Sequence, residues 1–348
     1  MAVTIVEAAP TVVGGVDTHL DVHVAAALDG AGALLGVELF PATSAGYRKL
    51  LGWLGGFGLV GRVGVEGTGA FGAGLTRFLR GSGVEVIEVD RANRQARRRH
   101  GKSDPADAIE AARAAHNGRA QGLAKSRDGN VEAIRALLVA TRSARNTRIK
   151  TLNQVRQLTF TAPDELRERM RGLGTVALTV EAAGLRPRPG GDSVLYATKL
   201  ALQVLGRRAL SLDAEAARVD AALAELVAGT APSLLGVYGV GVDTAAALLV
   251  AAGDNPERLR SEPAWAHLCG VAPVPASSGK VTRHRLDRGG NRQANSALWR
   301  IVMVRMALDP RTRTYVERRT KEGLSKLEII RVLKRYVARE VYRQLPRD

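Results

Sequence analysis

The sequence predicts an α/β domain, then a pair of long helices, then a mostly helical C-terminal domain. Short apolar stretches separated by turns and helical segments fill residues 12–89, which is typical of a mixed sheet with helices on its faces. Apolar residues recur at steps of three and four through most of 134–226. The last third is helical in pattern and strongly basic. We expect domains at 1–126, 127–228 and 229–348.

The first two strands lie in the stretch 12–28. An apolar strand ends on Asp17, a short polar break follows, and a second strand alternates apolar and polar residues before Asp29 and a glycine turn the chain back. A third strand at 34–40 would be the next antiparallel neighbour. The sheet is therefore expected to begin as a three-stranded meander.

Helices and strands then alternate. We expect a helix at 43–54, a strand at 59–66 that ends on Glu66, a helix at 70–80 and a strand at 84–89. Three antiparallel strands followed by helix, strand, helix and strand is the order of an RNase H-like fold. The glycine-rich turn after Glu66 lacks the spacing of a phosphate-binding loop, which disfavours a sugar kinase of the related actin-like fold.

A further helix should begin near Ser103. Ser103 or Asp104 can cap it, Pro105 suits its first turn, and residues 106–115 are strongly helix-forming. Asp104 and Asp107 are three positions apart, so they project from the same side of that turn.

Four acidic residues are candidate metal ligands. Taken alone, Asp17 is best explained as a solvated residue at a strand end, and acids in a first helical turn also complement the helix dipole. Together, Asp17, Glu66, Asp104 and Asp107 would converge at the carboxyl ends of the strands, where they could hold two Mg²⁺ (or Mn²⁺) ions. The joint pattern favours the metal site.

The charge points to a polyanionic partner. The 348-residue chain has a formal net charge of +17, and residues 279–348 hold 19 Lys and Arg against 7 Asp and Glu. A second basic run without acids lies at 91–102. The two runs favour nucleic acid. Cys269 is the single cysteine, so an intrachain disulfide or cysteine-based zinc site is excluded. We expect a soluble intracellular protein without a membrane segment.

The middle and last regions leave alternatives open. The heptad stretches at 134–159 and 195–226 predict a coiled coil, formed either within one chain or between chains. Residues 234–245 resemble a helix-hairpin-helix motif, although such glycine-rich turns also occur without a ligand. The Ser277-Ser278-Gly279 loop would ordinarily be only a turn.

Four segments resemble the IS one-ten (IS110) family of insertion-sequence transposases: 15–19, 65–69, 97–107 and 275–291. The resemblance implies an N-terminal RuvC-like domain with an Asp-Glu-Asp-Asp metal set at Asp17, Glu66, Asp104 and Asp107. It also implies a coiled coil, and a C-terminal transposase domain whose nucleophile would be Ser278. Ser277 is the less favoured neighbour.

The same resemblance implies a mechanism and partners. Ser278 would form a covalent ester with DNA, and a structured bridge RNA would pair with donor and target DNA. We expect a homo-oligomer, either a dimer or a tetramer, in the bacterial cytoplasm near the nucleoid. The expected nucleic-acid contacts are Arg97, Arg98, Arg99, Lys102, Lys280, Arg283, Arg285, Arg288 and Arg292.

Two other functions are compatible with parts of the sequence. A metal-dependent Holliday-junction nuclease would need the four carboxylates but not Ser278. A non-enzymatic basic DNA-binding protein would need neither.

Overall fold

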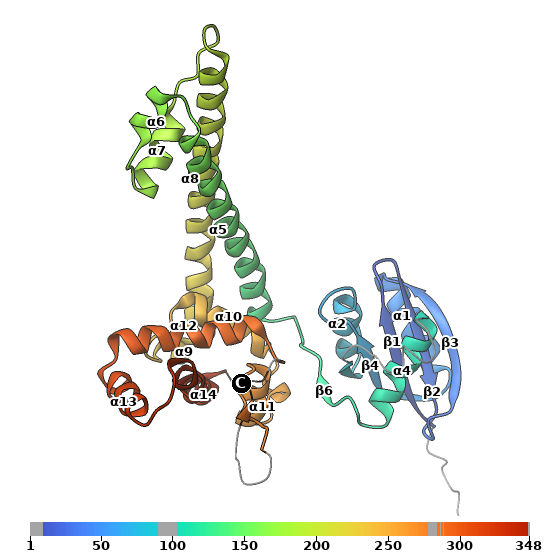
Figure 1. Cartoon of the computed structure of the whole chain (residues 1–348). Helices are drawn as coiled ribbons and strands as arrows, with labels where there is room; N and C mark the ends of the chain where they lie inside the picture. The colour runs from blue at the N-terminus through green and yellow to red at the C-terminus, as the bar shows by residue number, and fades with distance from the viewer. Residues whose placement is uncertain (1–9, 90–102, 278–283, 286, 288, 347–348) are drawn as a thin grey trace, which may run out of the picture. The chain divides into compact units, whose positions relative to one another are not determined.

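The computed structural model describes residues 10–89, 103–277, 284–285, 287 and 289–346. The chain forms two compact units (Figure 1). Unit 1 comprises Met1–Glu132, Ala252–Trp265 and Pro346–Asp348, and unit 2 comprises Ala133–Ala251 and Ala266–Leu345. None of the helices described is both long enough and apolar enough to cross a membrane.

Unit 1 is built on a six-stranded mixed sheet. Its strands are β1 (Thr11–Thr18), β2 (Val22–Leu28), β3 (Leu34–Pro41), β4 (Leu59–Glu66), β5 (Glu85–Val89) and β6 (Gly122–Leu123), in the order β3-β2-β1-β4-β5-β6. β1, β2 and β3 are antiparallel neighbours, β4 and β5 run parallel to β1, and β6 is antiparallel to β5. The predicted mixed sheet is confirmed, and β6 is an additional short strand.

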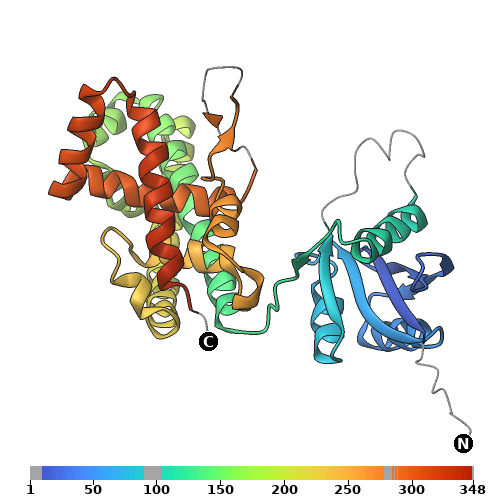
Figure 2. The ribbon, with the colours of Figure 1, turned by 90° about the horizontal axis from the view of Figure 1, so that it is seen from below.

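Helices cover both faces of this sheet. α1 (Ser44–Gly55) and α2 (Ala73–Gly81) pack on one face, and α4 (Asp104–His116) packs on the other (Figure 2). α1 begins where the sequence predicts, because the Thr43 side chain accepts a hydrogen bond from the Gly46 amide. The core between the sheet and the first two helices includes Val12, Val16, Val63, Val65, Leu50, Leu54, Leu75 and Leu79.

α4 lies directly on the sheet backbone. Gly15 of β1 and Gly64 of β4 are register partners, so the two missing side chains leave one shallow track across both strands. A Cβ atom added at Gly15 would lie 2.6 Å from Cα of Ala112, and one added at Gly64 would lie 3.0 Å from Cβ of Ala115. The buried face of α4 consists of small residues for the same reason, since larger side chains would hold the helix away.

A segment from late in the sequence folds with unit 1. Residues 252–265 contain the short helix η1 (Pro256–Arg258) and the start of α11 (Glu262–Leu268). The Asn255 side chain accepts a hydrogen bond from the Ser126 amide and donates one to the Ala124 carbonyl. Asp254 accepts a hydrogen bond from the Val131 amide at the start of α5. The polar contacts therefore fasten this segment to the edge of unit 1.

Unit 2 contains two long antiparallel helices, α5 (Asn130–Phe160) and α8 (Ser193–Thr230), which lie side by side (Figure 1). Arg145 forms ion pairs with Asp220 of α8 and Asp243 of α10, and Arg148 pairs with Asp213. The long helices therefore pair within one chain. α6 (Asp164–Met170) and α7 (Thr175–Gly184) pack against the C-terminal end of α5 and the N-terminal part of α8. This cluster includes Val155, Leu166, Met170, Leu178, Ala182 and Leu202.

The rest of unit 2 is mostly helical. It contains α9 (Pro232–Leu235), α10 (Val242–Ala252), the two-stranded β7 (Val274–Pro275) and β8 (His284–Arg285), α12 (Arg292–Leu308), α13 (Pro310–Lys321) and α14 (Lys326–Gln344). Side chains of Asn291, Asp309 and Ser325 cap the last three helices. The single cysteine, Cys269, is fully buried, as its apolar sequence neighbours indicate.

Of the helices described, α6, α7, α11 and α13 were not predicted. α7 lies within 172–192, which the sequence marks as a Gly- and Pro-rich spacer, and its apolar residues are held by contact with α8. α13 has only Thr312 buried, so it lacks the apolar stripe by which a helix is found in a sequence. Its start was nevertheless encoded, because Asp309 caps it and Pro310 occupies its first turn.

The packing of α4 gives a first prediction. Gly15→Ala should lower the free energy of unfolding of the protein by roughly 1–3 kcal/mol, because the added methyl group meets helix backbone that cannot rotate away. The matched control is Gly61→Ala on β4, where the new methyl group would meet only the Thr11 side chain, at 3.9 Å, and a backbone oxygen. Chemical denaturation followed by circular dichroism measures both. Equal stability of the two variants would contradict this account of the helix–sheet contact.

Candidate functional site

Strand alternation directs two of the predicted acids toward the face covered by α4. Val16 of β1 and Val65 of β4 belong to the core on the opposite face, so Asp17 and Glu66, the next residue of each strand, alternate to the α4 side. Val16 and Val65 are also register partners, which places Asp17 and Glu66 on neighbouring strands at the carboxyl end of both.

The first turn of α4 supplies the other two acids. Asp104 is its first residue, and Asp107, also in the first turn, is buried. Ser103 occupies the N-cap position, although its side chain makes no capping hydrogen bond, and Pro105 stands in the first turn, as predicted. Because α4 lies on Gly15 and Gly64, its N-terminal turn comes close to the strand residues that follow these glycines.

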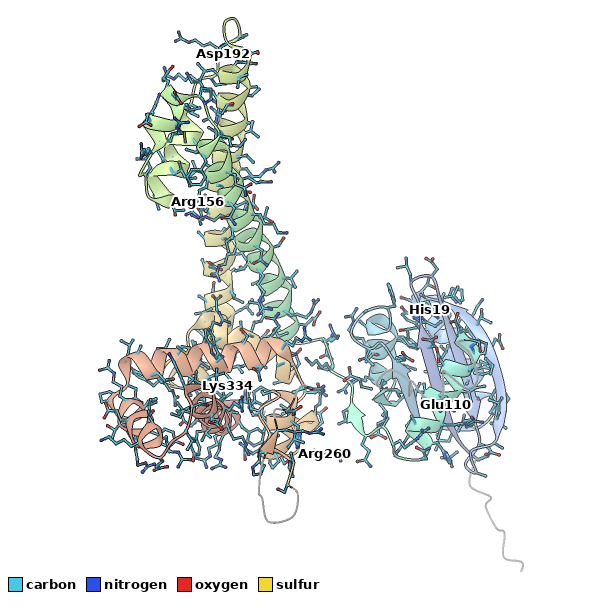
Figure 3. All side chains as sticks on the ribbon, viewed as in Figure 1. His19, Glu110, Arg156, Asp192, Arg260 and Lys334 are labelled. Carbon is cyan, nitrogen blue, oxygen red and sulfur yellow. The ribbon has the colours of Figure 1, made fainter. Side chains whose placement is uncertain are left out.

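The closest cluster includes a histidine that was not among the predicted site residues. The Nε2 atom of His19 lies 3.2 Å from Oδ2 of Asp17 and 3.4 Å from Oδ2 of Asp104 (Figure 3, where His19 is labelled). One ligand atom from each of these three residues lies within 4.8 Å of the others. Within the described residues, His19 Nε2 is buried and is not aligned for a hydrogen bond. Glu66 and Asp107 lie outside this three-residue group.

Burial raises the pKa of the Asp17 carboxyl above its ordinary value. His19 opposes this shift, and the nearby carboxylates of Asp107 and Asp104 add to it. Both carboxylates act on Asp17, so three of the four predicted acids share one electrostatic environment. Ionisation of Asp17 in the protein without a bound ion therefore lowers the free energy of unfolding.

Side chains from distant parts of unit 1 hold the end of β4. The Thr18 hydroxyl donates a hydrogen bond to the Glu66 carbonyl (2.8 Å), which ties the ends of β1 and β4 together. Two residues beyond Glu66, the Thr68 hydroxyl donates to Glu88 (2.9 Å). Glu88 in turn pairs with Arg258 (3.4 Å) from the segment 252–265. The surroundings of Glu66 thus depend on a residue from the last third of the chain.

Most of the other predicted site residues lie outside the described part of the chain. Ser278, Arg97, Arg98, Arg99, Lys102, Lys280, Arg283 and Arg288 belong to this group. Two predicted nucleic-acid contacts are described, and both are exposed: Arg285 lies on β8, and Arg292 is the first residue of α12.

Comparison with known proteins identifies two matching families. A model described as "Transposase", of the DEDD type found in IS110 elements, matches residues 14–161, and the "Transposase IS116/IS110/IS902 family" matches residues 231–317. Together the two matches cover more than half of the chain. The chain belongs to the IS110 family of transposases.

Two proteins of insertion elements are similar to this chain over part of their length. The "Insertion element IS110 uncharacterized 43.6 kDa protein" of Streptomyces coelicolor is 42% identical over 96 residues, which are 26% of this chain and 23% of the relative. The "Insertion element IS900 uncharacterized 42 kDa protein" of Mycobacterium paratuberculosis is 29% identical over 163 residues, which are 45% of this chain and 41% of the relative. The matched segments thus span less than half of each relative.

The donor set fits a divalent metal ion. DEDD transposases are a class for which carboxylate-bound metal is expected, and here carboxylate oxygens and an imidazole nitrogen face one another at ligand spacing. The sequence contained a signal for His19, because it follows Asp17 by two positions. That signal was hidden because β1 ends at Thr18, so the alternation of a strand no longer fixes where residue 19 points.

The raised pKa of Asp17 gives a second prediction. In chelator at neutral pH, Asp17→Asn should melt at a higher temperature than the parent, because it removes a buried charge beside other carboxylates. The folded-state pKa is above the unfolded value, so the parent loses stability as pH rises through this interval. The advantage of the variant should therefore vanish below the pKa of an unfolded aspartate, about 3.9.

Added Mn²⁺ should reverse the order, raising the melting temperature of the parent but not of Asp17→Asn. Asp21→Asn, an exposed acid on the same loop, is the matched control and should respond to Mn²⁺ as the parent does. A parent protein whose melting temperature does not respond to the ion would argue against a metal centre at Asp17.

Proposed function

We propose that this protein is the enzyme that moves its own insertion sequence by DNA strand transfer. The observation that carries the proposal is the approach of the first turn of α4 to the ends of β1 and β4, in a segment that matches a DEDD transposase family. The basic composition supports a nucleic-acid substrate, since each phosphate neutralised by Lys or Arg contributes to binding.

The architecture supports a RuvC-like assignment of the N-terminal domain. Three antiparallel strands continued by two parallel strands, with helices on both faces, is the arrangement expected for this fold. We assign the catalytic carboxylates to a domain at 1–126, a coiled coil to 127–228 and the transposase domain to 229–348.

The antiparallel pairing of α5 and α8 supports the coiled-coil assignment. The glycine-rich turn between α9 and α10 is our candidate for a helix-hairpin-helix phosphate contact.

Asp17, Glu66, Asp104 and Asp107 would hold Mg²⁺ or Mn²⁺, with His19 beside them. When bound, such ions lower the pKa of a coordinated hydroxyl and neutralise charge on a phosphodiester. The chain's own part is positional: the glycine track sets the distance from α4 to the strands, and Thr18 fastens the end of β4. His19 places its ring nitrogen between two carboxylates, and an imidazole ligand would favour Mn²⁺ over Mg²⁺.

The covalent step is assigned to Ser278. Its hydroxyl oxygen would form a bond to a DNA phosphorus, the hydroxyl proton would pass to a base or to water, and the bond from phosphorus to the leaving deoxyribose oxygen would break as that oxygen takes up a proton. The resulting phosphoserine ester conserves the energy of the broken strand for rejoining. Donor and target DNA would be selected by a structured bridge RNA, and a dimer or tetramer would bring the ends together.

Removal of one carboxylate tests the metal site. Asp107→Asn keeps the size of a buried side chain and removes its charge, so strand transfer should fall by more than about a hundredfold, since even outer-shell partners of metal sites contribute roughly 10–100-fold. Glu110→Gln is the matched control, because Glu110 (labelled in Figure 3) lies on the same helix and pairs with Arg113 and Arg119. Normal strand transfer by Asp107→Asn would exclude Asp107 from the site.

The nucleophile is tested separately. Ser278→Ala deletes one hydroxyl, so its effect on stability should stay within about 0.5 kcal/mol if the loop is exposed. It should bind DNA and guide RNA as the parent does, yet form no covalent adduct and no recombinant product. Ser277→Ala is the control and should form both. A denaturing gel of protein incubated with labelled DNA, guide RNA and Mg²⁺ shows the adduct as a protease-sensitive shifted band.

The outcome of that gel also separates two enzymes. Full DNA cleavage by Ser278→Ala without an adduct would indicate a metal-dependent junction nuclease, which activates water and needs no protein nucleophile. Binding without cleavage by every variant, including the parent, would indicate a DNA-binding protein instead.

A further inference from the structure

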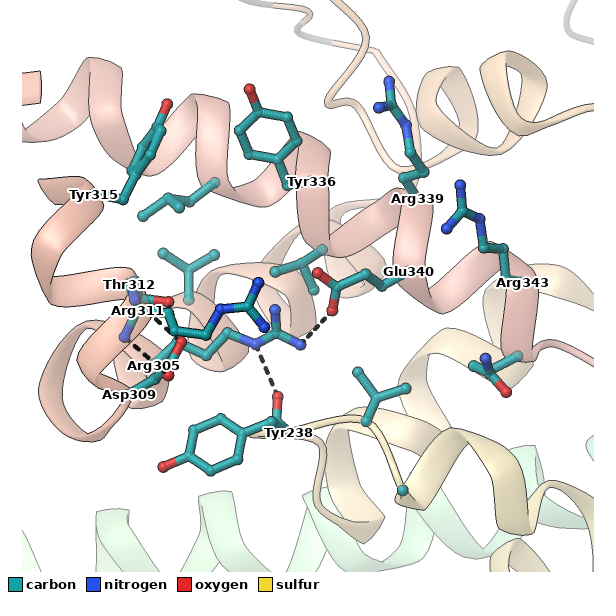
Figure 4. Close-up of a pocket in the computed structure, with 16 residues that line it drawn as sticks. Tyr238, Arg305, Asp309, Arg311, Thr312, Tyr315, Tyr336, Arg339, Glu340 and Arg343 are labelled. Carbon is teal, nitrogen blue, oxygen red and sulfur yellow. Dashed lines mark hydrogen bonds and ion pairs between the residues drawn. The ribbon is translucent and has the colours of Figure 1, made fainter.

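A cavity of about 890 Å³ lies in unit 2, and none of the residues assigned to catalysis is among those that line it. It is formed by the turn at 236–238 and by α12, α13 and α14, and Figure 4 shows tyrosine and arginine side chains among the residues that line it. Its volume lies within the range of small-ligand sites, about 300–1,000 Å³. The cavity can therefore admit one or two nucleotides but is too small for a duplex.

The cavity has an excess of positive charge. Four arginines and two acids line it, and both acids are already engaged. Asp309 caps α13 by accepting hydrogen bonds from the Arg311 and Thr312 amides and from the Thr312 hydroxyl, which holds the pKa of Asp309 below its ordinary value. Glu340 pairs with Arg305 at 2.7 Å. An anionic ligand is therefore favoured over a neutral one.

Two arginines are available to bind such an anion. Within the part of the chain that the structure describes, the guanidinium groups of Arg311 and Arg343 have no hydrogen-bond or ion-pair partner. Arg305 is fixed instead, because it also donates to the Tyr238 carbonyl at 2.8 Å. Guanidinium groups bind phosphate through paired N–H donors, so Arg311 and Arg343 are suited to a phosphodiester.

Aromatic rings are concentrated in the same place. Three of the six tyrosines of the chain, Tyr238, Tyr315 and Tyr336, line the cavity. Tyr238 is 53% exposed and Tyr336 is 46% exposed, so both rings present a large apolar surface to solvent. Tyr315 meets Tyr336 edge to face at 6.1 Å and so holds the Tyr336 ring in place. Exposed rings beside arginines suit stacking on an unpaired base.

We propose that this cavity binds an unpaired nucleotide of single-stranded nucleic acid. Arg311 and Arg343 bind its phosphates, and its base stacks on Tyr336 or Tyr238. Paired bases stay stacked inside a duplex and cannot reach the rings, so the site selects single strands. A displaced DNA strand and an RNA loop both present this chemistry. The inference does not depend on the proposed strand transfer, and its test involves no catalysis.

Binding of fluorescent 12-mers of thymidine or uridine to the whole protein tests the phosphate contacts. Arg311→Gln combined with Arg343→Gln should weaken binding of single strands at least about tenfold. The control for a general loss of charge is Arg313→Gln combined with Lys321→Gln, exposed basic residues of α13 that do not line the cavity. A loss with thymidine, uridine or both supports the site and identifies the strand it takes. Binding equal to the control with both strands overturns the proposal.

The base contact is tested by pairing a protein variant with a ligand variant. Tyr336→Leu keeps apolar bulk but removes the ring, so it should weaken binding of the 12-mer about tenfold, as expected for loss of one stacked base. It should have no effect on an abasic strand of the same length. Equal weakening with both ligands would mean that no base stacks on this ring.

Photo-cross-linking keeps the test independent of folding of the variants. A 4-thiouridine or 4-thiothymidine strand irradiated with the unmodified protein should attach to peptides that contain Tyr238 or Tyr336. Attachment only to peptides elsewhere in the chain would overturn the proposal, whatever the variants show.

Discussion

The direct contact of α4 with the backbone of two strands is the constraint on which unit 1 depends. Gly15 and Gly64 stand side by side in register, and any side chain at either position would collide with the helix. Because side chains alternate along a strand, the same face carries Asp17 and Glu66 two residues later. The glycines therefore set the distance at which the acids of α4 meet those of the sheet. The alternation of side chains along β1 and β4 therefore determines both the close packing of α4 and the position of the acidic residues.

This arrangement concentrates negative charge where the first turn of α4 meets the end of β1. Burial and the neighbouring carboxylates raise the pKa of Asp17, and His19 is the one described cation-forming group placed between two of the acids. Groups that destabilise a fold in this way are typical of functional sites, because selection for activity keeps them. The compensation comes from the packing beneath the site, where the small residues of α4 exclude water from the sheet.

Much of unit 1 could be predicted because its signals are local. Alternation of apolar residues located the strands, Thr43 marked the start of α1, and the capping pattern at Ser103 located α4. His19 was missed because the chain leaves strand geometry after Thr18. The contact of Arg258 with Glu88 could not be predicted at all, since 170 positions separate the two residues and no periodicity relates them. Local propensity defines elements, whereas the surroundings of a site depend on tertiary contacts.

The long helices α5 and α8 also show the difference between local sequence signals and tertiary contacts. Arg145 and Arg148 interrupt the apolar seam of α5, which from the sequence alone weakens the case for a paired helix. In the structure they are the residues that fix the pairing, because they meet Asp220 and Asp213 of α8 across it. Ion pairs this exposed contribute little to stability, at most about 1 kcal/mol each. They discriminate between registers instead, since a shift of one heptad would separate each arginine from its acid. The interruptions of the seam are therefore what specifies the register of α5 against α8.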